Sequence, residues 1–132
     1  MKTLLDIKPS VGKFPLKHPV TLEPLTTDEG VEVIWDVVGQ DSDEYLLAQQ
    51  DFLKDLEKMG DKASKMTAVD YKEQTAIQLA KVVVGWDEQF NDFMGGPFST
   101  DKVNKLLTGI DQKWIVSQLD LFVSQRRNFF TV

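Results

Sequence analysis

The residue types that carry most enzyme chemistry are scarce in this sequence. The chain has no cysteine, which excludes thiolate catalysis, disulfide bonds and cysteine-based zinc or iron–sulfur sites. His18, in the segment LKHPV, is the one histidine, so a Ser-His-Asp triad would need it as the base. No G-x-S-x-G segment supplies the matching nucleophile. We therefore expect His18 to be a solvent-facing strand or loop residue.

Acidic residues could in principle bind a metal or transfer protons. The segment DSDE, Asp41–Glu44, begins like a calcium loop, but Tyr45 and Leu46 stand where that loop needs a third oxygen ligand and a glycine. Carboxylate pairs such as Asp87 and Glu88 can serve acid–base catalysis, but they indicate little in a chain with 21 acidic residues. Capping of a helix is the better interpretation of Asp41–Glu44.

Phosphate-binding loops also lack their signature. The chain holds neither a Walker lysine loop nor a G-x-G-x-x-G segment. Gly95-Gly96-Pro97 has no lysine after it, and such a tripeptide is typical of a tight turn before a helix. The sequence therefore predicts no enzyme, no cofactor and no metal site.

Clustered aromatic side chains are the remaining constellation. Four lie close together between Trp86 and Phe98, and Phe129-Phe130 form a pair near the C-terminus. Most could fill the core, but adjacent residues on a helix point about 100° apart, so one face rarely buries both members of a pair. The acidic residues Asp87, Glu88 and Asp92 could form the polar rim of an interface. The candidates for a protein-binding surface are Trp86, Phe90, Phe93, Phe129 and Phe130.

Length and charge limit the partners of these candidates. The 132 residues are enough for a single domain, 1–132, with its own core. A net charge of −6 repels nucleic-acid phosphates and anionic membranes, and it suits a basic protein partner. The N-terminus lacks the apolar region of a signal peptide, and no apolar run reaches the roughly 20 residues of a membrane span.

The elements that must position the candidates divide into two parts, and the first, residues 1–40, is expected to be rich in β-structure. Four of the five prolines lie there, which disfavours a long helix. Residues 31–38, VEVIWDVV, alternate and predict a strand with one mostly apolar face. Residues 14–17 could pair with it, and Gly30 is free to take a positive φ in the turn between them.

The second part, residues 41–132, is expected to be helical. Asp41 is predicted to cap a helix that ends at Gly60, with Glu44 as its capping-box partner. Thr67 and Asp70 predict the start of a second helix, whose apolar end at 82–86 should be buried on several sides and whose core face should include Val69. Ser99 or Thr100 should cap a third helix, and Asp111 a fourth that runs over 114–127. The predicted fold class is α+β, predominantly helical: a short N-terminal β-hairpin or small sheet followed by about four helices.

The order of several segments resembles the tail assembly chaperones of long-tailed, siphovirus-type bacteriophages. Together they cover well over half of the chain. Their co-linearity carries the resemblance, since each motif alone is weak. The segments are LKHPVTLEPLT (16–26), VVGQDSDEY (37–45), VVGW (83–86), PFSTDKVNKLL (97–107) and WIVSQLDLFVSQRRNFF (114–130).

The resemblance implies a small, mostly helical chaperone of the host cytoplasm that is absent from the finished virion. Such a protein binds the tape measure protein, keeps it soluble and helps to recruit tail tube subunits, the major tail protein. An apolar groove would reversibly bury amphipathic helices of the client. The alternatives are a structural tail completion or head–tail joining protein of the virion, or a small regulatory adaptor.

The resemblance also implies a longer form made by ribosomal frameshifting, of which this chain would be the short form. Asn128-Phe129-Phe130 can be encoded AAU-UUU-UUY, a run on which a ribosome could slip back one base. We hypothesise that frameshifting occurs there; the alternative is that the two phenylalanines simply pack. An asparagine codon ending in C would exclude the slip. The apolar residues 82–86 and an open sheet edge also favour self-association.

Overall fold

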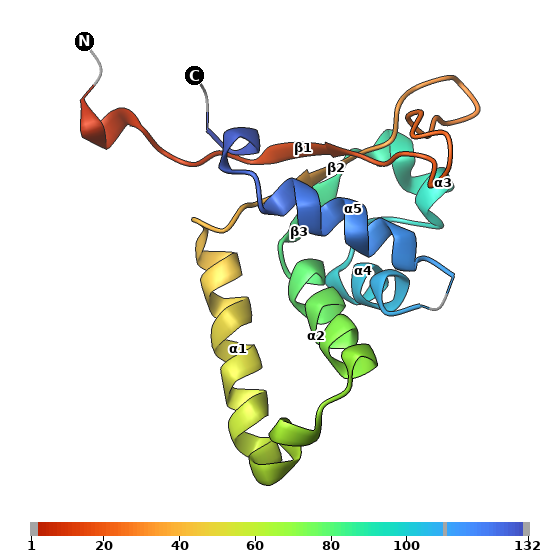
Figure 1. The fold of residues 1–132 in the computed structure, drawn as a ribbon. Coiled ribbons are helices and arrows are strands. Elements are labelled where there is room, and N and C mark those ends of the chain that lie inside the picture. Colours follow the sequence, from red (N-terminus) through yellow and green to blue (C-terminus); the bar gives the residue numbers. More distant parts are fainter. Residues whose placement is uncertain (1–2, 110, 131–132) are drawn as a thin grey trace.

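The chain forms a small sheet with helices packed around it, and the predicted α+β, mostly helical fold class is confirmed (Figure 1). This is a computed structural model, and it describes residues 3–109 and 111–130. The strands are β1 (Gly12–Pro15), β2 (Ile34–Val37) and β3 (Val83–Trp86). The helices are α1 (Asp43–Met59), α2 (Ala68–Ala80), α3 (Asn91–Met94), α4 (Thr100–Leu107) and α5 (Lys113–Val123).

The sheet is antiparallel, in the order β1-β2-β3. The predicted pairing of the first two strands is confirmed, with Phe14 opposite Trp35. Trp35 also faces Trp86 on β3, so one aromatic row crosses all three strands. Val33 and Trp35 are fully buried, as the alternation predicted, but Val31 on the same predicted face is 39% exposed, because the strand begins only at Ile34. Gly30 has the expected positive φ of 81°.

The third strand corrects the prediction that residues 82–86 form the end of a helix. Helix α2 stops at Ala80, and the main-chain N–H of Val38 donates to the carbonyl of Val82 at 2.9 Å. Three successive valines are β-branched and fit a pleated surface better than a helix. The buried central strand β2 needs a partner on its second edge, and this segment supplies it.

Val69, predicted in the core, is instead 65% exposed.

Helices α2, α4 and α5 pack against one another and around the sheet to close the core (Figure 1). Phe14 on β1 contacts Phe122 on α5, with ring centroids 5.2 Å apart. The side chains with no exposed area include Trp35 and Val37 on β2, Val103 on α4 and Leu119 on α5, together with Val33 just before β2 and Val82 just before β3.

Two helix starts follow the sequence prediction closely. Thr67 and Asp70 form a full capping box at α2, in which each side chain accepts from the other residue's main-chain N–H. The Ser99 hydroxyl accepts from the N–H of Lys102 at the start of α4. These local signals depend on residues three apart, which is why the sequence alone contains them.

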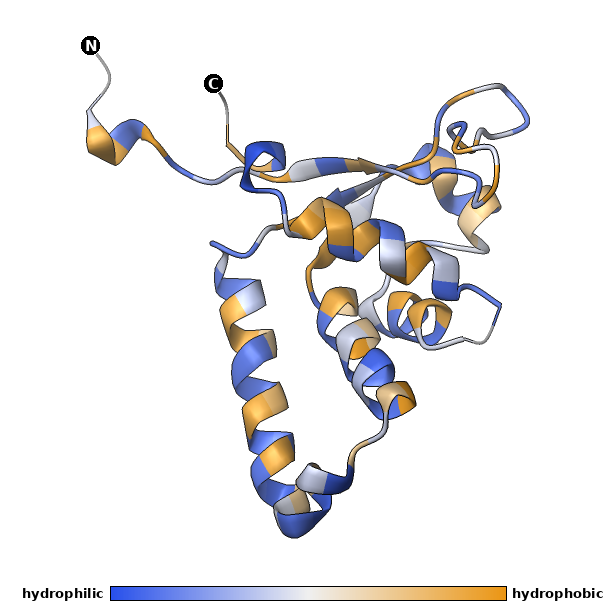
Figure 2. Cartoon of the chain, viewed as in Figure 1, coloured by the Kyte–Doolittle hydropathy of each residue, from blue (hydrophilic) through white to orange (hydrophobic). Residues whose placement is uncertain are grey.

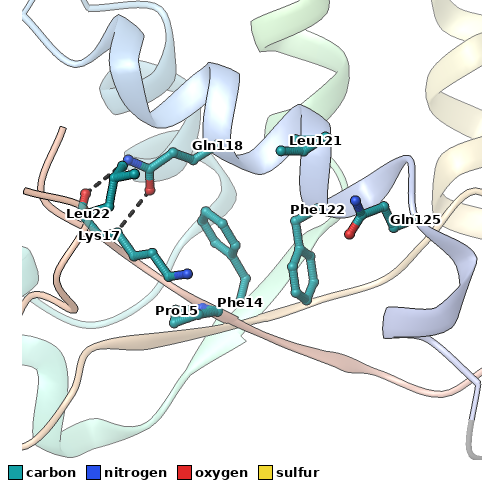
Figure 3. Close-up of a pocket in the computed structure, with 8 residues that line it drawn as sticks. All are labelled: Phe14, Pro15, Lys17, Leu22, Gln118, Leu121, Phe122 and Gln125. Atoms are coloured by element: carbon teal, nitrogen blue, oxygen red, sulfur yellow. Dashed lines mark hydrogen bonds between the residues drawn. The ribbon is translucent and has the colours of Figure 1, made fainter. Parts of the chain in front are cut away.

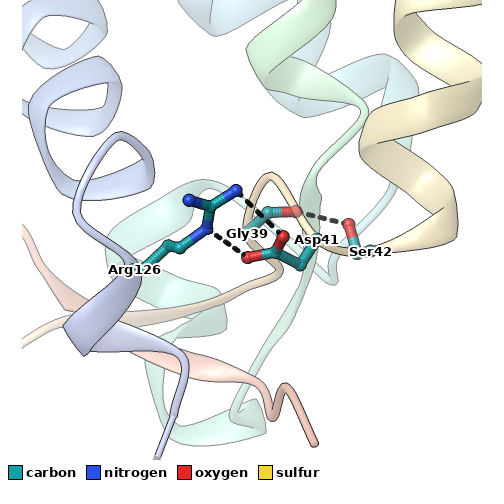
Figure 4. A network of polar contacts seen from close by, with 4 residues as sticks. All are labelled: Gly39, Asp41, Ser42 and Arg126. Atoms are coloured by element: carbon teal, nitrogen blue, oxygen red, sulfur yellow. Dashed lines mark hydrogen bonds and ion pairs between the residues drawn. The ribbon is translucent and has the colours of Figure 1, made fainter.

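Two other predicted caps are wrong. At α1 the cap is Ser42, whose Oγ accepts from the N–H of Tyr45 at 3.2 Å, because the Asp41 carboxylate is bound instead to Arg126 (Figure 4). At α5 the N-cap position is Gln112, one residue after Asp111, and it makes no side-chain capping bond. Helix α5 also ends at Val123, short of the predicted Arg127.

Candidate protein-binding surfaces

The aromatic segment from Trp86 to Phe98 lies mostly inside the protein. Trp86 is 8% exposed and stacks on Trp35 with ring centroids 6.0 Å apart. The edge of Phe98 meets it at 5.2 Å, and the Trp86 indole Nε1–H donates to Oδ1 of Asn91 at 3.0 Å. With its ring packed and its one polar atom bonded, Trp86 has no group left to offer a partner.

Phe90 and Phe93 point in different directions. Phe90 is buried, at the end of a short turn that Asp87 caps by accepting from the N–H of Gln89. Phe93, on α3, is 46% exposed. Phe90 therefore belongs to the core, whereas Phe93 faces solvent.

Phe129 fills a cradle made by two glycines. Its side chain is 1% exposed and meets the edge of Phe122 at 5.4 Å. A Cβ added at Gly39 would lie 2.5 Å from Cδ2 of the ring, and one added at Gly12 would lie 2.7 Å from Cε1. The ring thus occupies the space that side chains at these two positions would need. Phe130 is half-buried and packs against the same core.

The five candidate residues therefore do not form one surface. The prediction that they lie at the surface is wrong for Trp86, Phe90 and Phe129, which are buried. It holds for Phe93 and in part for Phe130. Phe129 can be buried because the glycines at 12 and 39 leave room for its ring.

A separate apolar surface lies on the helical hairpin formed by α1 and α2. We call residues 49–75 the hairpin tip: all of them are described, and none is buried. The side of α1 that holds Tyr45, Phe52 and Leu56 is only half-buried, and Leu46 and Leu53 beside it are 53% and 58% exposed. Figure 2 shows hydrophobic and hydrophilic residues interleaved along both helices. The tip is an amphipathic pair without a third layer.

The contacts that hold α1 to the body lie near its start. Ala48 is the one buried residue of this helix. The guanidinium of Arg126 donates to both carboxylate oxygens of Asp41, at 2.9 and 3.3 Å (Figure 4). Lys81 donates to Asp51 at 3.0 Å, and this hydrogen bond, with the positive charge of Lys81, lowers the pKa of Asp51. These contacts lie at or before Asp51, so the rest of the hairpin extends beyond them.

A second apolar surface is a groove between β1 and α5 (Figure 3). We call it the β1–α5 groove; its volume is about 310 Å³. Leu22 and Leu121, on its two sides, are each 63% exposed. Gln118 docks the neighbouring loop by bonding the main-chain N–H and carbonyl of Lys17, at 3.2 and 3.0 Å. The lining residues are Phe14, Pro15, Lys17, Leu22, Gln118, Leu121, Phe122 and Gln125.

Sequence reasoning missed both of these surfaces for different reasons. The groove joins residues about a hundred positions apart, for which the sequence offers no local signal. The hairpin did leave one: Leu46 and Leu53 widen the apolar stripe of α1 beyond what a single neighbouring helix covers.

The histidine and the acidic residues considered as catalytic or metal-binding groups have structural roles or lie apart. His18 is exposed, and its Nδ1 accepts from the main-chain N–H groups of Val20 and Thr21, so it organises a turn, as a loop residue would. Among the described residues, no group of three or more histidine, cysteine or acidic side chains could hold a metal ion. No helix within them has the length and apolar character to cross a membrane.

Comparison of this chain with protein-family models, curated proteins and solved structures finds no match. A proposal about function rests on three features of the chain. They are the hairpin, the β1–α5 groove and the segments that resemble tail assembly chaperones. The first two present apolar side chains to solvent, which is typical of protein-binding surfaces.

Proposed function

We propose that this protein is a non-enzymatic tail assembly chaperone of a long-tailed bacteriophage, which binds the tape measure protein in the host cytoplasm. The observation that supports the proposal best is the hairpin tip, which contains no buried residue over 49–75. Two amphipathic helices that bury no residue over this range lack the third element that normally packs on their apolar faces.

The client in this proposal is an amphipathic helix laid along the hairpin. It would cover the flank of α1 that holds Leu46 and Leu53, and the exposed Val69 of α2. Full burial of a leucine or valine side chain contributes roughly 1.5–3 kcal/mol, so a few such contacts give reversible binding. A chain of net charge −6 would keep the complex soluble and favour basic client segments.

The other roles in the proposal follow from the resemblance. The protein would help to recruit tail tube subunits, with a longer frameshifted form as one route, and it would leave before the virion is complete. Purified particles test this part directly. Finding the chain there would identify it as a structural tail completion or head–tail joining protein instead.

The decisive experiment is co-expression with the tape measure protein, the long helical protein that this proposal expects to be encoded next to this gene. We expect the wild-type chain to raise the soluble fraction of that protein and to co-purify with it. Failure of both would overturn the chaperone proposal, since keeping the client soluble is the activity itself.

A matched pair of variants then tests the hairpin. Leu53 and Leu47 are both 58% exposed on α1, so Leu→Glu at either position should leave the fold intact. They lie about 120° apart around the helix, and Leu47 has polar neighbours at Asp43, Glu44 and Asp51. We expect Leu53→Glu to weaken client binding at least tenfold, roughly 1.4 kcal/mol, and Leu47→Glu to preserve it. Equal effects would exclude this face of the hairpin.

A further inference from the structure

The segment before β1 is an exposed arm with apolar side chains. Every residue from Thr3 to Val11 is exposed, with Leu4 at 82%, Leu5 at 80% and Ile7 at 61%. Figures 1 and 2 show it leaving the body, with hydrophobic residues in a short turn. We call residues 3–11 the N-terminal arm.

The turn in the arm has its own stabilising contacts. Leu4–Asp6 form a single 3-10 turn, and the Asp6 carboxylate accepts from the main-chain N–H of Thr3 at 2.8 Å and from its hydroxyl at 3.2 Å. The two leucines are therefore presented on a closed turn. Apolar side chains held ready in this way lose less entropy on binding than those of a random tail.

The base of the arm fixes its direction. The main-chain N–H of Ser10 donates to the carbonyl of Phe129 at 2.6 Å, and its hydroxyl donates to the same oxygen at 3.2 Å. Pro9 has a fixed φ and disfavours the helical region for Lys8, so the arm is extended where it joins Ser10. The arm therefore points away from its own body.

The β1–α5 groove lies toward the opposite end of β1, at Phe14 and Pro15 (Figure 3). Its walls are mostly apolar, and both polar ends of the Gln118 amide are already bonded to Lys17. A polar ligand would find few free partners there, whereas aliphatic side chains could cover Leu22 and Leu121.

We propose that the N-terminal arm of one copy docks in the β1–α5 groove of a second copy. The arm and the groove are both apolar and uncovered, and they lie toward opposite ends of β1 within one chain. The charges of the two contacting parts do not repel each other. The arm holds one acid and one base, Asp6 and Lys8, and the lining of the groove holds a single charge, Lys17. This inference concerns a different surface from the hairpin and goes beyond the proposed chaperone activity.

The test is the mass of the full chain in solution, measured by light scattering over a range of protein concentrations. We expect the wild type to associate, and Leu5→Asp in the arm or Leu121→Asp in the groove to weaken association at least tenfold, roughly 1.4 kcal/mol. Val20→Asp is the control, because Val20 is 81% exposed in the loop beside the groove but does not line it.

Mixing the two defective variants tests whether the arm of one copy meets the groove of another. Leu5→Asp retains an intact groove and Leu121→Asp an intact arm, so their mixture should form a one-to-one complex that neither forms alone. A wild type that stays monomeric, or a mixture that does not pair, overturns the proposal. Leu53→Glu on the hairpin should associate like the wild type, so this test and the client-binding test fail independently.

Discussion

At the scale of single residues, the ring of Phe129 is closely enclosed by main chain. It touches the main chain at the start of β1 and at the connection from β2 to α1, through Gly12 and Gly39. The same residue's carbonyl accepts from Ser10. Phe129 thus ties the C-terminal segment to the start of β1 and to the β2–α1 connection, and the two glycines are required for close approach rather than for a positive φ.

A double-mutant cycle tests this cradle. Gly39→Ala should destabilise the protein by about 1–3 kcal/mol through overpacking, because the three nearest atoms to the new Cβ all belong to Phe129. Phe129→Ala alone should cost about 3–5 kcal/mol by leaving a cavity. The double variant should cost clearly less than the sum, because the new methyl enters the emptied space. Urea unfolding measures all three.

The control for this cycle is Gly85→Ala in β3. A Cβ there would meet only Oδ2 of Asp36, at an ordinary 3.9 Å, so we expect little loss of stability. Strictly additive costs for Gly39→Ala and Phe129→Ala would show that the ring and the glycine do not share one space.

The cap of α1 provides a second prediction at this scale. Ser42→Ala should lower the free energy of unfolding by about 1 kcal/mol, because the Tyr45 N–H loses its acceptor and the Gly39 carbonyl loses the bond from the serine hydroxyl. Asp41→Asn should cost less, since it weakens an exposed ion pair with Arg126. Denaturant unfolding measures both losses. A larger loss for Asp41→Asn than for Ser42→Ala would show that Asp41 is the cap.

At the scale of elements, local signals explain what the sequence predicts correctly. The β1–β2 pairing follows from the alternation of apolar and polar residues, and the starts of α2 and α4 follow from capping residues. The choice between Asp41 and Ser42 depends on Arg126, 85 residues away. The end of α2 depends on the open edge of β2, which turns an apolar run at Val82 into a strand.

The candidate site was less predictable than the fold. Whether Phe90 or Phe93 faces inward depends on the orientation of a one-turn helix, α3, which composition does not specify. The burial of Phe129 depends on two distant glycines that meet only in the folded chain. The apolar arm was visible in the sequence as Leu4, Leu5 and Ile7, but its exposure required the folded body for comparison.

The attachment of α1 gives a prediction in pH. Hydrogen bonding to Lys81 lowers the pKa of Asp51, so this contact stabilises the attached helix above the ordinary carboxylate pKa of about 4 and is lost as the pH falls through the lowered value. Lys81→Gln should therefore raise the pKa of Asp51 toward its ordinary value. An NMR titration of the Asp51 carboxyl carbon measures it.

A second lysine supplies the control for this titration. Lys54 also lowers the pKa of Asp51, but through charge alone and as the smallest of the causes. Lys54→Gln should therefore produce a smaller rise than Lys81→Gln. An Asp51 pKa that does not respond to Lys81→Gln would show that α1 is not held there in solution.

At the scale of the whole molecule, buried side chains are unevenly distributed. The sheet with α2, α4 and α5 contains the core, while the hairpin tip at 49–75 and the N-terminal arm at 3–11 contribute no buried apolar side chain to it. Both exposed parts present leucines, and they extend from the body in different directions (Figure 1). This arrangement of one core and two uncovered apolar extensions suits the proposed binding of a client and of a second copy at the same time.

This unevenness predicts a hierarchy of hydrogen exchange. Amides of the hairpin tip should exchange through local opening at a small fraction of the global free energy, because few buried contacts oppose it. Amides of β2 and α5 should exchange only on global unfolding, since Trp35, Val37 and Leu119 are completely buried. Low urea should therefore accelerate exchange in β2 but hardly in the tip. Equal protection of the two regions would show that the hairpin unfolds together with the core and is not an independently opening, client-ready surface.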